Sequence, residues 1–306
     1  MKKALIIFNP VAGVEESGLF LPSLIDQLTD SNYLSFVLAT QKEGDEEVFV
    51  KKFGQEVDLV ICLGGDGTLS RVVSGLLSLN PKPELAYIPS GSTNDFANGV
   101  GMGDLHREEL INLACQGKTS LFDVGSLNDR PFIYVAAFGL FTSVAYRTPQ
   151  DQKNLLGRLA YFFEGVKDLT QIKTHSIKLR YDGGDLEGDF ILGLVSNSNS
   201  VAGFTSITGP TDYYDGLFEV LLVKAAAKPL DLAGALHDLI AGRDNALILR
   251  LQTTRLDLIS GDDLAWTLDG EEGDKGKEAK IRVLPKALSI RTPLGNKPAK
   301  AIFHDK

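Results

Sequence analysis

Residues 58–77 read DLVICLGGDGTLSRVVSGLL. An apolar run of strand formers ends in glycines that surround one aspartate, Asp66, and a helical pattern follows. Glycines permit left-handed backbone angles and a close ligand, and the N–H groups of such a turn can hold a phosphate. Thr68 is placed to cap the following helix. The turn is neither a P-loop nor a GxGxxG motif, so a phosphate site and a plain strand-to-helix turn stand as equal interpretations.

The segments around this turn alternate between strand and helix patterns. Strand-like runs lie at 4–8, 33–39, 58–63 and 84–89, and helical patterns lie at 19–30, 45–54, 68–79 and 107–117. This alternation predicts βαβ units and therefore an α/β domain with a parallel sheet. Ligands of such sheets bind at the carboxyl ends of the strands. GGDGT, FNPVAG (8–13) and IPSGSTNDFA (88–97) are expected there.

The pattern changes beyond about residue 122, where strand-like runs follow one another. Ile177, Leu179 and Tyr181 alternate with polar residues, as on a half-buried antiparallel strand. Two helical patterns interrupt this half, at 154–169 and 229–242. The second half is therefore predicted to be a β-sandwich or barrel. The strand-like runs are 121–127, 131–138, 176–182, 189–198, 217–224, 247–259, 264–270, 279–285 and 287–293.

Charge and cysteine content exclude several classes of protein. The net charge of the 306 residues is −9, with 31 basic and 40 acidic residues, which argues against broad binding to nucleic acid. Cys62 and Cys115 form no disulfide framework, and the four histidines form no zinc motif. Apolar runs are shorter than a membrane-spanning helix requires. We expect a cytoplasmic protein whose membrane contact is peripheral.

The second glycine-bearing loop, PSGSTNDFANG (89–99), also follows a predicted strand. It offers the hydroxyls of Ser90, Ser92 and Thr93, the amide of Asn94 and the carboxylate of Asp95. Alone, the loop is better interpreted as a hydrogen-bonded turn before a short helix. Two polar loops of this kind at neighbouring strand ends favour a shared ligand site.

Two further acidic motifs occur in the second half. In DYYDGLFEV (212–220), Asp212 and Asp215 with a backbone carbonyl suit a hard cation such as Mg²⁺, although an ordinary Asp-Gly turn is the favoured interpretation of the motif alone. In LAWTLDGEEG (264–273), Asp269 and Glu271 share one face of an extended strand. One could orient a hydroxyl while the other holds a metal, and a polar hairpin turn is the alternative.

Taken together and in this order, the motifs resemble the bacterial diacylglycerol kinase catalytic-domain family. This is a family of soluble lipid kinases related to sphingosine and ceramide kinases and, more distantly, to NAD kinases. The resemblance covers nearly the whole chain, and its ordered set of motifs is specific. The motifs are NPVAG (9–13), GGDGT (64–68), PSGSTNDFA (89–97), FDVG (122–125), LLGRLAY (155–161), DYYDGLFEV (212–220), LDGE (268–271) and RVLPKALSIRTP (282–293).

The resemblance implies a fold and an activity. It implies an N-terminal α/β domain, residues 1–122, similar to NAD kinases and phosphofructokinases, and a β-sandwich lipid-substrate domain, residues 123–289. The tail, about 290–306, returns to the first domain. The implied reaction transfers the γ-phosphate of ATP, with Mg²⁺ as cofactor, to a lipid hydroxyl, with diacylglycerol as the first expectation and phosphatidic acid as product. The implied partners are a lipid at the membrane surface, contacted transiently, and a second copy in a homodimer.

The resemblance also implies roles for individual residues. Asp269 corresponds to the general base for the lipid hydroxyl, and Glu271 lies beside it. Asp66, Asp95 and Asp123 correspond to an acidic network near nucleotide and metal. Asp212 and Asp215, with the Leu217 carbonyl, correspond to a structural Mg²⁺ site. The full set of nucleotide-binding residues expected on this basis is Asn9, Pro10, Gly64, Gly65, Asp66, Gly67, Thr68, Gly91, Ser92, Asn94, Asp95 and Asp123.

Two substitutions depart from the family pattern, and several functions stay open. Ala12 replaces a serine and loses a hydroxyl, whereas Ser92 replaces a threonine and keeps one.

A cation that stabilises the transferred charge is expected, and the sequence does not choose among Lys153, Arg158 and Lys167. The alternatives are a kinase for phosphatidylglycerol, undecaprenol or a sphingoid base, an NAD kinase, and a non-catalytic nucleotide- or lipid-binding regulator.

Overall fold

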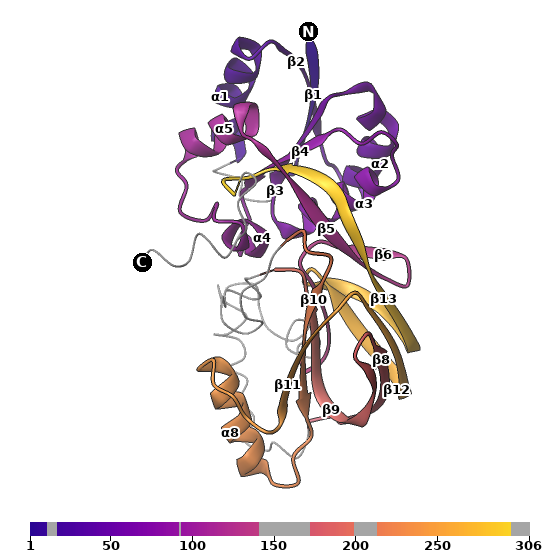
Figure 1. The fold of residues 1–306 in the computed structure, drawn as a ribbon. Helices are drawn as coiled ribbons and strands as arrows, with labels where there is room; N and C mark the ends of the chain where they lie inside the picture. The colour runs from indigo at the N-terminus through magenta and orange to yellow at the C-terminus, as the bar shows by residue number, and fades with distance from the viewer. Residues whose placement is uncertain (11–16, 92, 141–171, 199–212, 295–306) are drawn as a thin grey trace. The chain divides into compact units, whose positions relative to one another are not determined.

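The computed structural model describes residues 1–10, 17–91, 93–140, 172–198 and 213–294. The chain divides into two compact units. The first unit combines residues 1–124 with residues 285–306, and the second comprises residues 125–284. Figure 1 shows residues 1–124 of the first unit in indigo to magenta, the end of β13 in yellow, and most of the second unit in pink to orange. Each unit is described by itself below.

The first unit is a sheet with helices on both faces. β1 pairs in parallel with β2 and β3, β3 pairs in parallel with β4, and the end of β13 joins β4 in parallel. Helices α1 and α5 lie on one side of these strands, and α2 and α3 lie on the other (Figure 1). Its strands are β1 (Lys2–Phe8), β2 (Tyr33–Ala39), β3 (Leu59–Gly64), β4 (Glu84–Pro89) and most of β5 (Thr119–Leu127). Its helices are α1 (Ser17–Asp30), α2 (Asp45–Phe53), the 3-10 helix Gly54–Glu56, α3 (Asp66–Leu77), α4 (Asp95–Gly99) and α5 (Arg107–Gln116).

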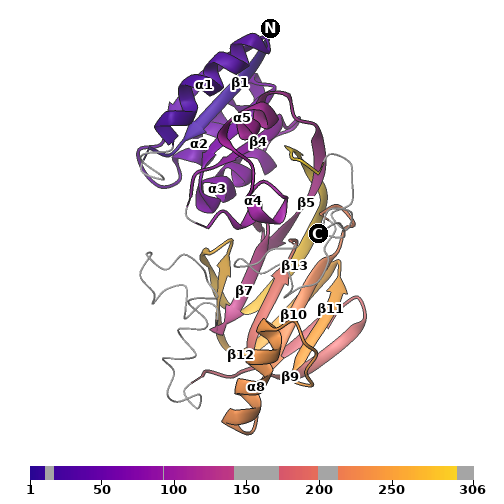
Figure 2. The same ribbon diagram turned by 90° about the vertical axis from the view of Figure 1, so that its left-hand side faces the viewer.

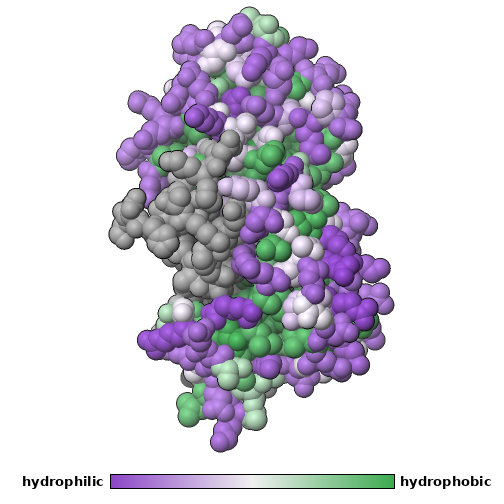
Figure 3. Space-filling model, viewed as in Figure 1, coloured by the Kyte–Doolittle hydropathy of each residue, from purple (hydrophilic) through white to green (hydrophobic). Residues whose placement is uncertain are grey.

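Hydrophobic patterning explains these elements. All six residues of β3 are buried, as expected of a strand covered on both faces. α3 buries Leu69, Val72, Val73 and Leu76, which recur at helical spacing along one face. Hydrophilic side chains cover much of the described surface of this unit on the face shown in Figure 3. The β3–α3 pair is thus fixed by apolar burial on both sides of the GGDGT turn.

The second unit is built from antiparallel strands. β9 and β12 each run beside two shorter strands: β7 pairs with one half of each, and β8 pairs with the other half. β7 and β8 therefore share one row of the sheet. The elements of this unit are β6 (Arg130–Phe132), β7 (Val135–Gly139), β8 (His175–Tyr181), β9 (Gly184–Ser196), β10 (Phe218–Lys224), α8 (Pro229–Ile240), β11 (Ile248–Thr253), β12 (Arg255–Leu268) and most of β13 (Glu271–Arg291).

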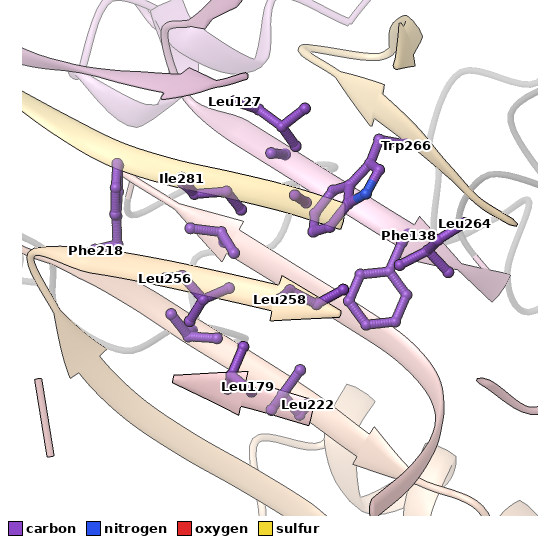
Figure 4. Close-up of a cluster of buried hydrophobic side chains, with 14 of the residues drawn as sticks. Leu127, Phe138, Leu179, Phe218, Leu222, Leu256, Leu258, Leu264, Trp266 and Ile281 are labelled. Carbon is purple, nitrogen blue, oxygen red and sulfur yellow. The ribbon is translucent and has the colours of Figure 1, made fainter. Parts of the chain in front are cut away.

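Large apolar side chains form one core in the second unit (Figure 4). Phe132 stacks on Phe218 with ring centroids 5.6 Å apart, and Phe138 meets the edge of Trp266 at 5.0 Å. These side chains come from β6, β7, β10 and β12, so the cluster joins strands that are distant in sequence. Each fully buried ring contributes roughly 1.5–3 kcal/mol relative to an exposed one.

The structure corrects three local expectations. Thr68 does not cap α3, because the helix begins two residues earlier, at Asp66, and Thr68 is buried inside the first turn. The run 131–138 forms two strands, β6 and β7, because the N–H groups of Ile133 and Tyr134 donate to the side chain of Asp269. The run 247–259 is divided between β11 and β12. The helical pattern 154–169 lies outside the described residues.

Candidate active site

Asp66 ties the two glycine-bearing loops of the first unit together. Its Oδ2 accepts the backbone N–H of Asp95 at 3.0 Å, and its Oδ1 accepts that of Phe96 at 3.3 Å. Both N–H groups belong to the first turn of α4, where helical N–H groups have no partner within the helix. A side chain of the GGDGT turn therefore caps the helix that follows the second loop; α3 and α4 are drawn next to each other in Figure 2.

The environment of Asp66 disfavours its charge. Burial raises the pKa of Asp66, and the N–H groups of Asp95 and Phe96 act in the opposite direction. The net direction is upward, so the ionised carboxylate is held at a cost in free energy.

Glycines allow these two loops to touch. A Cβ on Gly91 would lie 2.6 Å from the Cα of Gly65, and a Cβ on Gly65 would lie 3.3 Å from the Cα of Gly91. A Cβ on Gly64 would lie 2.6 Å from the side chain of Thr68. Real Cβ atoms do not approach other atoms as closely as 2.6 Å, because the atoms would overlap. Gly91 is therefore required for packing between the loops and Gly64 for packing against Thr68 in its own turn, whereas a Cβ on Gly65 would make a tight contact with Gly91.

Asn94 closes the second loop. Its backbone is left-handed, with φ at 49°. Its amide donates to the Gly91 carbonyl at 2.8 Å, and its Oδ1 accepts the Gly91 N–H at 3.0 Å and the Tyr87 hydroxyl at 3.3 Å. Burial, followed by the charges of Asp66 and Asp95 among others, raises the pKa of Tyr87 well above its usual value. The Tyr87 hydroxyl thus stays protonated and acts as a donor.

The remaining nucleotide-binding candidates lie after β1, in the first turn of α3 and on β5, apart from one that is not described. The N–H of Asn9 donates to the Leu63 carbonyl at 3.2 Å, which places the end of β1 beside the GGDGT turn, and Pro10 follows it, exposed. Gly67 lies in the first turn of α3. Asp123 is fully buried on β5, and its Oδ1 accepts the N–H of Lys286 at 2.6 Å. Ser92 lies outside the described residues.

Asp269 lies in the tight turn between β12 and β13. Leu268 and Glu271 pair across the turn, and φ is 50° at Asp269 and 83° at Gly270. Left-handed angles at both central residues are what a two-residue Asp-Gly hairpin requires. The N–H of Asp269 donates to the Val135 carbonyl at 2.9 Å, which anchors the turn to β7.

The carboxylate of Asp269 is buried and held by backbone donors. Oδ2 accepts the N–H of Ile133 at 2.8 Å, and Oδ1 accepts those of Tyr134 at 3.0 Å and Val135 at 3.1 Å. Asp269 is 3% exposed, whereas Glu271, at the start of β13, is exposed. Charge-assisted bonds of this kind fix orientation and stabilise the carboxylate. Asp269 is thus presented in one geometry.

The predicted Mg²⁺ site is only partly described. Asp212 lies outside the described residues, and Oδ1 of Asp215 accepts the N–H of Leu217 at 3.0 Å. Within the described ranges, no group of three or more His, Cys, Asp or Glu side chains is placed to hold a metal. These residues alone therefore do not assemble a ligand set. The candidate cations Lys153, Arg158 and Lys167 also lie outside the described residues.

Sequence patterns missed one buried acid in the first unit, Glu46. It is 2% exposed in the first turn of α2. The run DEEVFVKK was interpretable only as a charged helix, yet Glu46 and the buried Val50 are four residues apart and share a face. That spacing was the available signal.

Comparisons with known proteins agree with the two units. Residues 3–127 match the diacylglycerol kinase catalytic domain model, and residues 135–292 match the YegS C-terminal NAD kinase β-sandwich-like domain model. The expected two-domain architecture, an N-terminal α/β domain and a C-terminal β-sandwich-like domain, is confirmed. No described helix is long and apolar enough to cross a membrane.

Several curated relatives align over most of the chain. A diacylglycerol kinase of Bacillus subtilis strain 168 is 35% identical over 230 residues, covering 74% of this chain and 75% of that protein. A diacylglycerol kinase of Staphylococcus epidermidis is 32% identical over 299 residues, covering 95% and 92%. A diacylglycerol kinase of Staphylococcus aureus strain MRSA252 is 31% identical over 281 residues, covering 90% and 87%.

Solved structures from Bacillus anthracis strain Sterne share the fold. One crystal structure superposes with a TM-score of 0.82 at 25% identity, covering 95% of this chain and 97% of that chain. The crystal structure of a diacylglycerol kinase from the same strain superposes with a TM-score of 0.75 at 23% identity and the same coverage.

Proposed function

The chain belongs to the diacylglycerol kinase family, and we propose that it is an ATP-dependent lipid kinase that phosphorylates the hydroxyl of diacylglycerol to give phosphatidic acid. The observation that carries this proposal is the buried Asp269 carboxylate, oriented by the N–H groups of residues 133–135. A carboxylate in one fixed geometry suits the positioning of an acceptor hydroxyl, which is the main task of a phosphotransfer enzyme.

ATP is assigned to the loops 64–68 and 91–96 of the first unit. Both follow parallel strands at their carboxyl ends, where ligands of such sheets bind. Backbone N–H groups of the first loop would face the phosphates, since those of Gly91, Asp95 and Phe96 in the second loop donate to Asn94 and Asp66. Asp66 would keep the two loops in register by holding the start of α4. On this account the negative charge in GGDGT serves the protein backbone. It need not contact the nucleotide.

The transfer step follows from the role of Asp269. The acceptor oxygen bonds to the γ-phosphorus, the bond from that phosphorus to the β,γ-bridging oxygen breaks, and ADP leaves. The hydroxyl proton passes to Asp269 late in the step, because an alcohol becomes acidic only as its bond to phosphorus forms. Glu271, exposed beside it on the hairpin, is proposed to contact the active site without taking this proton.

Mg²⁺ enters the proposal as part of the substrate. ATP would bind as its magnesium complex, which offsets phosphate charge. The structural Mg²⁺ site at Asp212, Asp215 and the Leu217 carbonyl stays a prediction. A lipid acceptor also implies transient contact with a membrane surface.

A lipid panel tests the proposal. The purified protein is incubated with γ-labelled ATP and mixed micelles of diacylglycerol, phosphatidylglycerol, undecaprenol or sphingosine, with NAD in a parallel tube. Labelled phosphatidic acid is the expected product. Label in a different lipid would identify that lipid as the substrate of the same kind of kinase reaction. Label in NAD would show that the protein is an NAD kinase and not a lipid kinase. ATP binding without any labelled product would favour a regulator.

A further inference from the structure

A cavity of about 380 Å³ opens in the first unit between α1, α4, α5 and the end of β4. The three helices lie one below another, in the order α1, α5, α4, in Figure 1. Nε2 of Gln27 on α1 donates to Oδ1 of Asn112 on α5 at 3.2 Å, which ties two of them together. Pockets of roughly 300–1,000 Å³ hold small ligands and headgroups. This α5 cavity is therefore large enough for a ligand, and no role has been assigned to it above.

The walls of the α5 cavity are half apolar and carry no negative charge. Among the described residues that line it, no side chain is acidic. The acids nearest to it in sequence, Asp104, Glu108 and Glu109, are exposed and do not line it. The apolar side chains that line it are Phe20, Pro89, Ala97, Met102, Leu105 and Leu110.

Arg107 brings a fixed positive charge to the cavity. It is the one lysine or arginine among the described residues that line the cavity, and it is exposed at the start of α5. Its guanidinium carbon lies 5.4 Å from the centroid of the Phe20 ring, a cation–π contact that orients the guanidinium. Arg107 forms no ion pair with any residue that the structure describes. The charge is thus held in place by an aromatic ring and is free to meet an anion.

His106 and Glu109 explain why an acid of α5 stays out of the cavity. Oε2 of Glu109 accepts the N–H of His106 at 2.8 Å, and the His106 side chain accepts the N–H of Glu109 in return. This reciprocal cap engages the Glu109 carboxylate at the helix start. The His106 nitrogen that accepts carries no proton, so in the neutral ring the other nitrogen is a donor. His106 lines the cavity and therefore adds a donor beside Arg107.

The wall opposite α5 is held in one shape. Nδ2 of Asn98 donates to the Thr93 carbonyl at 3.0 Å, and a Cβ on Gly103 would overlap Oδ1 of Asn98. Asn94, whose side chain closes the second glycine-bearing loop, also lines the cavity. The α5 cavity is consequently preformed, and it adjoins the loop at the carboxyl end of β4 to which ATP is assigned.

An amphiphile with an anionic head fits these walls. An anion is complementary to Arg107, whereas an inorganic phosphate ion would leave the apolar side chains against water. A phospholipid supplies a phosphate and, next to it, an apolar glycerol ester. A protein with a net charge of −9 has no general attraction to an anionic membrane, so contact with such a membrane requires a local site of this kind.

We propose that the α5 cavity binds the phosphate headgroup of an anionic phospholipid through Arg107 and so docks the first unit on the membrane surface. This inference rests on the proposed function only in expecting the enzyme to reach a lipid in a membrane. It assigns membrane contact to the first unit, independently of where the acceptor lipid binds.

Vesicle flotation without ATP or diacylglycerol tests the inference. Vesicles of phosphatidylcholine alone, or of phosphatidylcholine with an equal amount of phosphatidylserine, which has no hydroxyl to phosphorylate, are mixed with the wild type, Arg107→Gln or Leu105→Asp. Lys82→Gln is the matched control, because it removes an exposed cation two residues before β4, at the opposite end of that strand from Pro89. Wild type and control should bind the mixed vesicles and bind phosphatidylcholine at least tenfold more weakly. Arg107→Gln should bind the mixed vesicles about tenfold more weakly than wild type, and Leu105→Asp at least as weakly, because its carboxylate repels the phosphate.

The outcomes separate this inference from its alternatives. Equal wild-type binding to both kinds of vesicle, or unchanged binding by Arg107→Gln, would overturn it. An equal loss in Lys82→Gln would assign the attraction to net charge and overturn it as well. Calorimetric titration with glycerol 3-phosphate covers a soluble ligand: binding that depends on Arg107, with no binding to vesicles, would overturn the lipid assignment.

Failure of the proposed function is seen in a different experiment. Vesicle binding is measured without ATP, so it does not depend on phosphate transfer, and absence of any labelled lipid in the panel above would overturn the kinase proposal alone. Thermal unfolding of each variant checks that it is folded.

Discussion

Asp66 shows how one charged side chain can hold two loops together. It is the only acid of GGDGT, and its carboxylate bonds to the backbone at the start of α4. The sequence predicted a group near nucleotide or metal but not this contact, because the partners lie 29 and 30 residues away and no local pattern encodes a link between two loops.

The pH dependence of stability should reveal the cost of this charge. Since the pKa of Asp66 is raised by burial, its contribution to stability is present below the usual value of 3.8 and is lost as pH rises through the folded-state pKa. We therefore expect the stability of wild type relative to Asp66→Asn to fall as pH rises from about 3.5 to about 7, on top of a pH-independent cost in the variant, because the Asn amide nitrogen cannot accept the second of the two N–H groups. Denaturant unfolding across this range measures it. A pH-independent difference would contradict the assignment.

Removing both acceptors should cost more stability than removing one. Asp66→Ala leaves the N–H groups of Asp95 and Phe96 without their acceptor. It should be about 1–3 kcal/mol less stable than Asp66→Asn. Both variants should bind ATP more weakly than wild type. Equal stability of the two variants in urea unfolding would show that the hydrogen bonds to α4 contribute nothing to the free energy of unfolding.

The contact between glycines is testable in the same way. Gly91→Ala places a methyl group against the Cα of Gly65 and should cost about 1–3 kcal/mol, with loss of ATP affinity. Gly234→Ala on α8 is the matched control, because a Cβ there meets nothing within 4 Å. In a helix this change should stabilise by about 0.5–1 kcal/mol. Urea unfolding of both variants decides, and a Gly91→Ala protein as stable as wild type would refute the packing argument.

At the scale of elements, the period and composition of the apolar residues were sufficient to predict strands that have one or both faces buried. The strands expected at 33–39 and 84–89 are found with those bounds. The division of the predicted strand 131–138 has a physical cause, which is that a side chain interrupts backbone pairing. Asp269 draws the N–H groups of Ile133 and Tyr134 out of a strand pattern, from 136 and 135 residues away. The sequence placed Asp269 and Glu271 on one face of an extended strand, with a polar hairpin turn as the alternative. The structure has the turn, and the sequence did not indicate that the carboxylate would be buried.

β13 is secured in the first unit by Arg291, which is 5% exposed. Its guanidinium donates to Glu84, to the carbonyls of Ala114 and Cys115, and to the Tyr33 hydroxyl. It therefore joins β13 to β4, α5 and β2.

Arg291→Ala should consequently destabilise the protein by about 3–5 kcal/mol, because buried acceptors lose their charged donor. Arg180→Ala, which removes an exposed cation paired with Asp185, should leave the unfolding midpoint unchanged. Chemical unfolding followed by circular dichroism measures both. A similar small effect from the two substitutions would mean that β13 is held mainly by its backbone pairing.

At the scale of the whole molecule, chain order distributes the candidate chemistry over both units. Asp66 and Asn94 belong to the first unit, whereas Asp269 and Glu271 belong to the second. The sequence indicated this division through the change from alternating helices and strands to successive strands. It could not indicate which acids are buried, because burial depends on contacts between segments far apart in the chain.

The claim that the chain is a lipid kinase in which Asp269 takes the hydroxyl proton is tested most directly by the rate of phosphate transfer to diacylglycerol. Transfer of label from γ-labelled ATP to diacylglycerol in mixed micelles is followed for wild type, Asp269→Asn and Glu271→Gln, each shown to be folded by thermal unfolding. We predict labelled phosphatidic acid from the wild type and a rate about 10²–10⁴-fold lower for Asp269→Asn, with a smaller loss for Glu271→Gln. A folded Asp269→Asn protein that phosphorylates diacylglycerol at the wild-type rate would contradict the account.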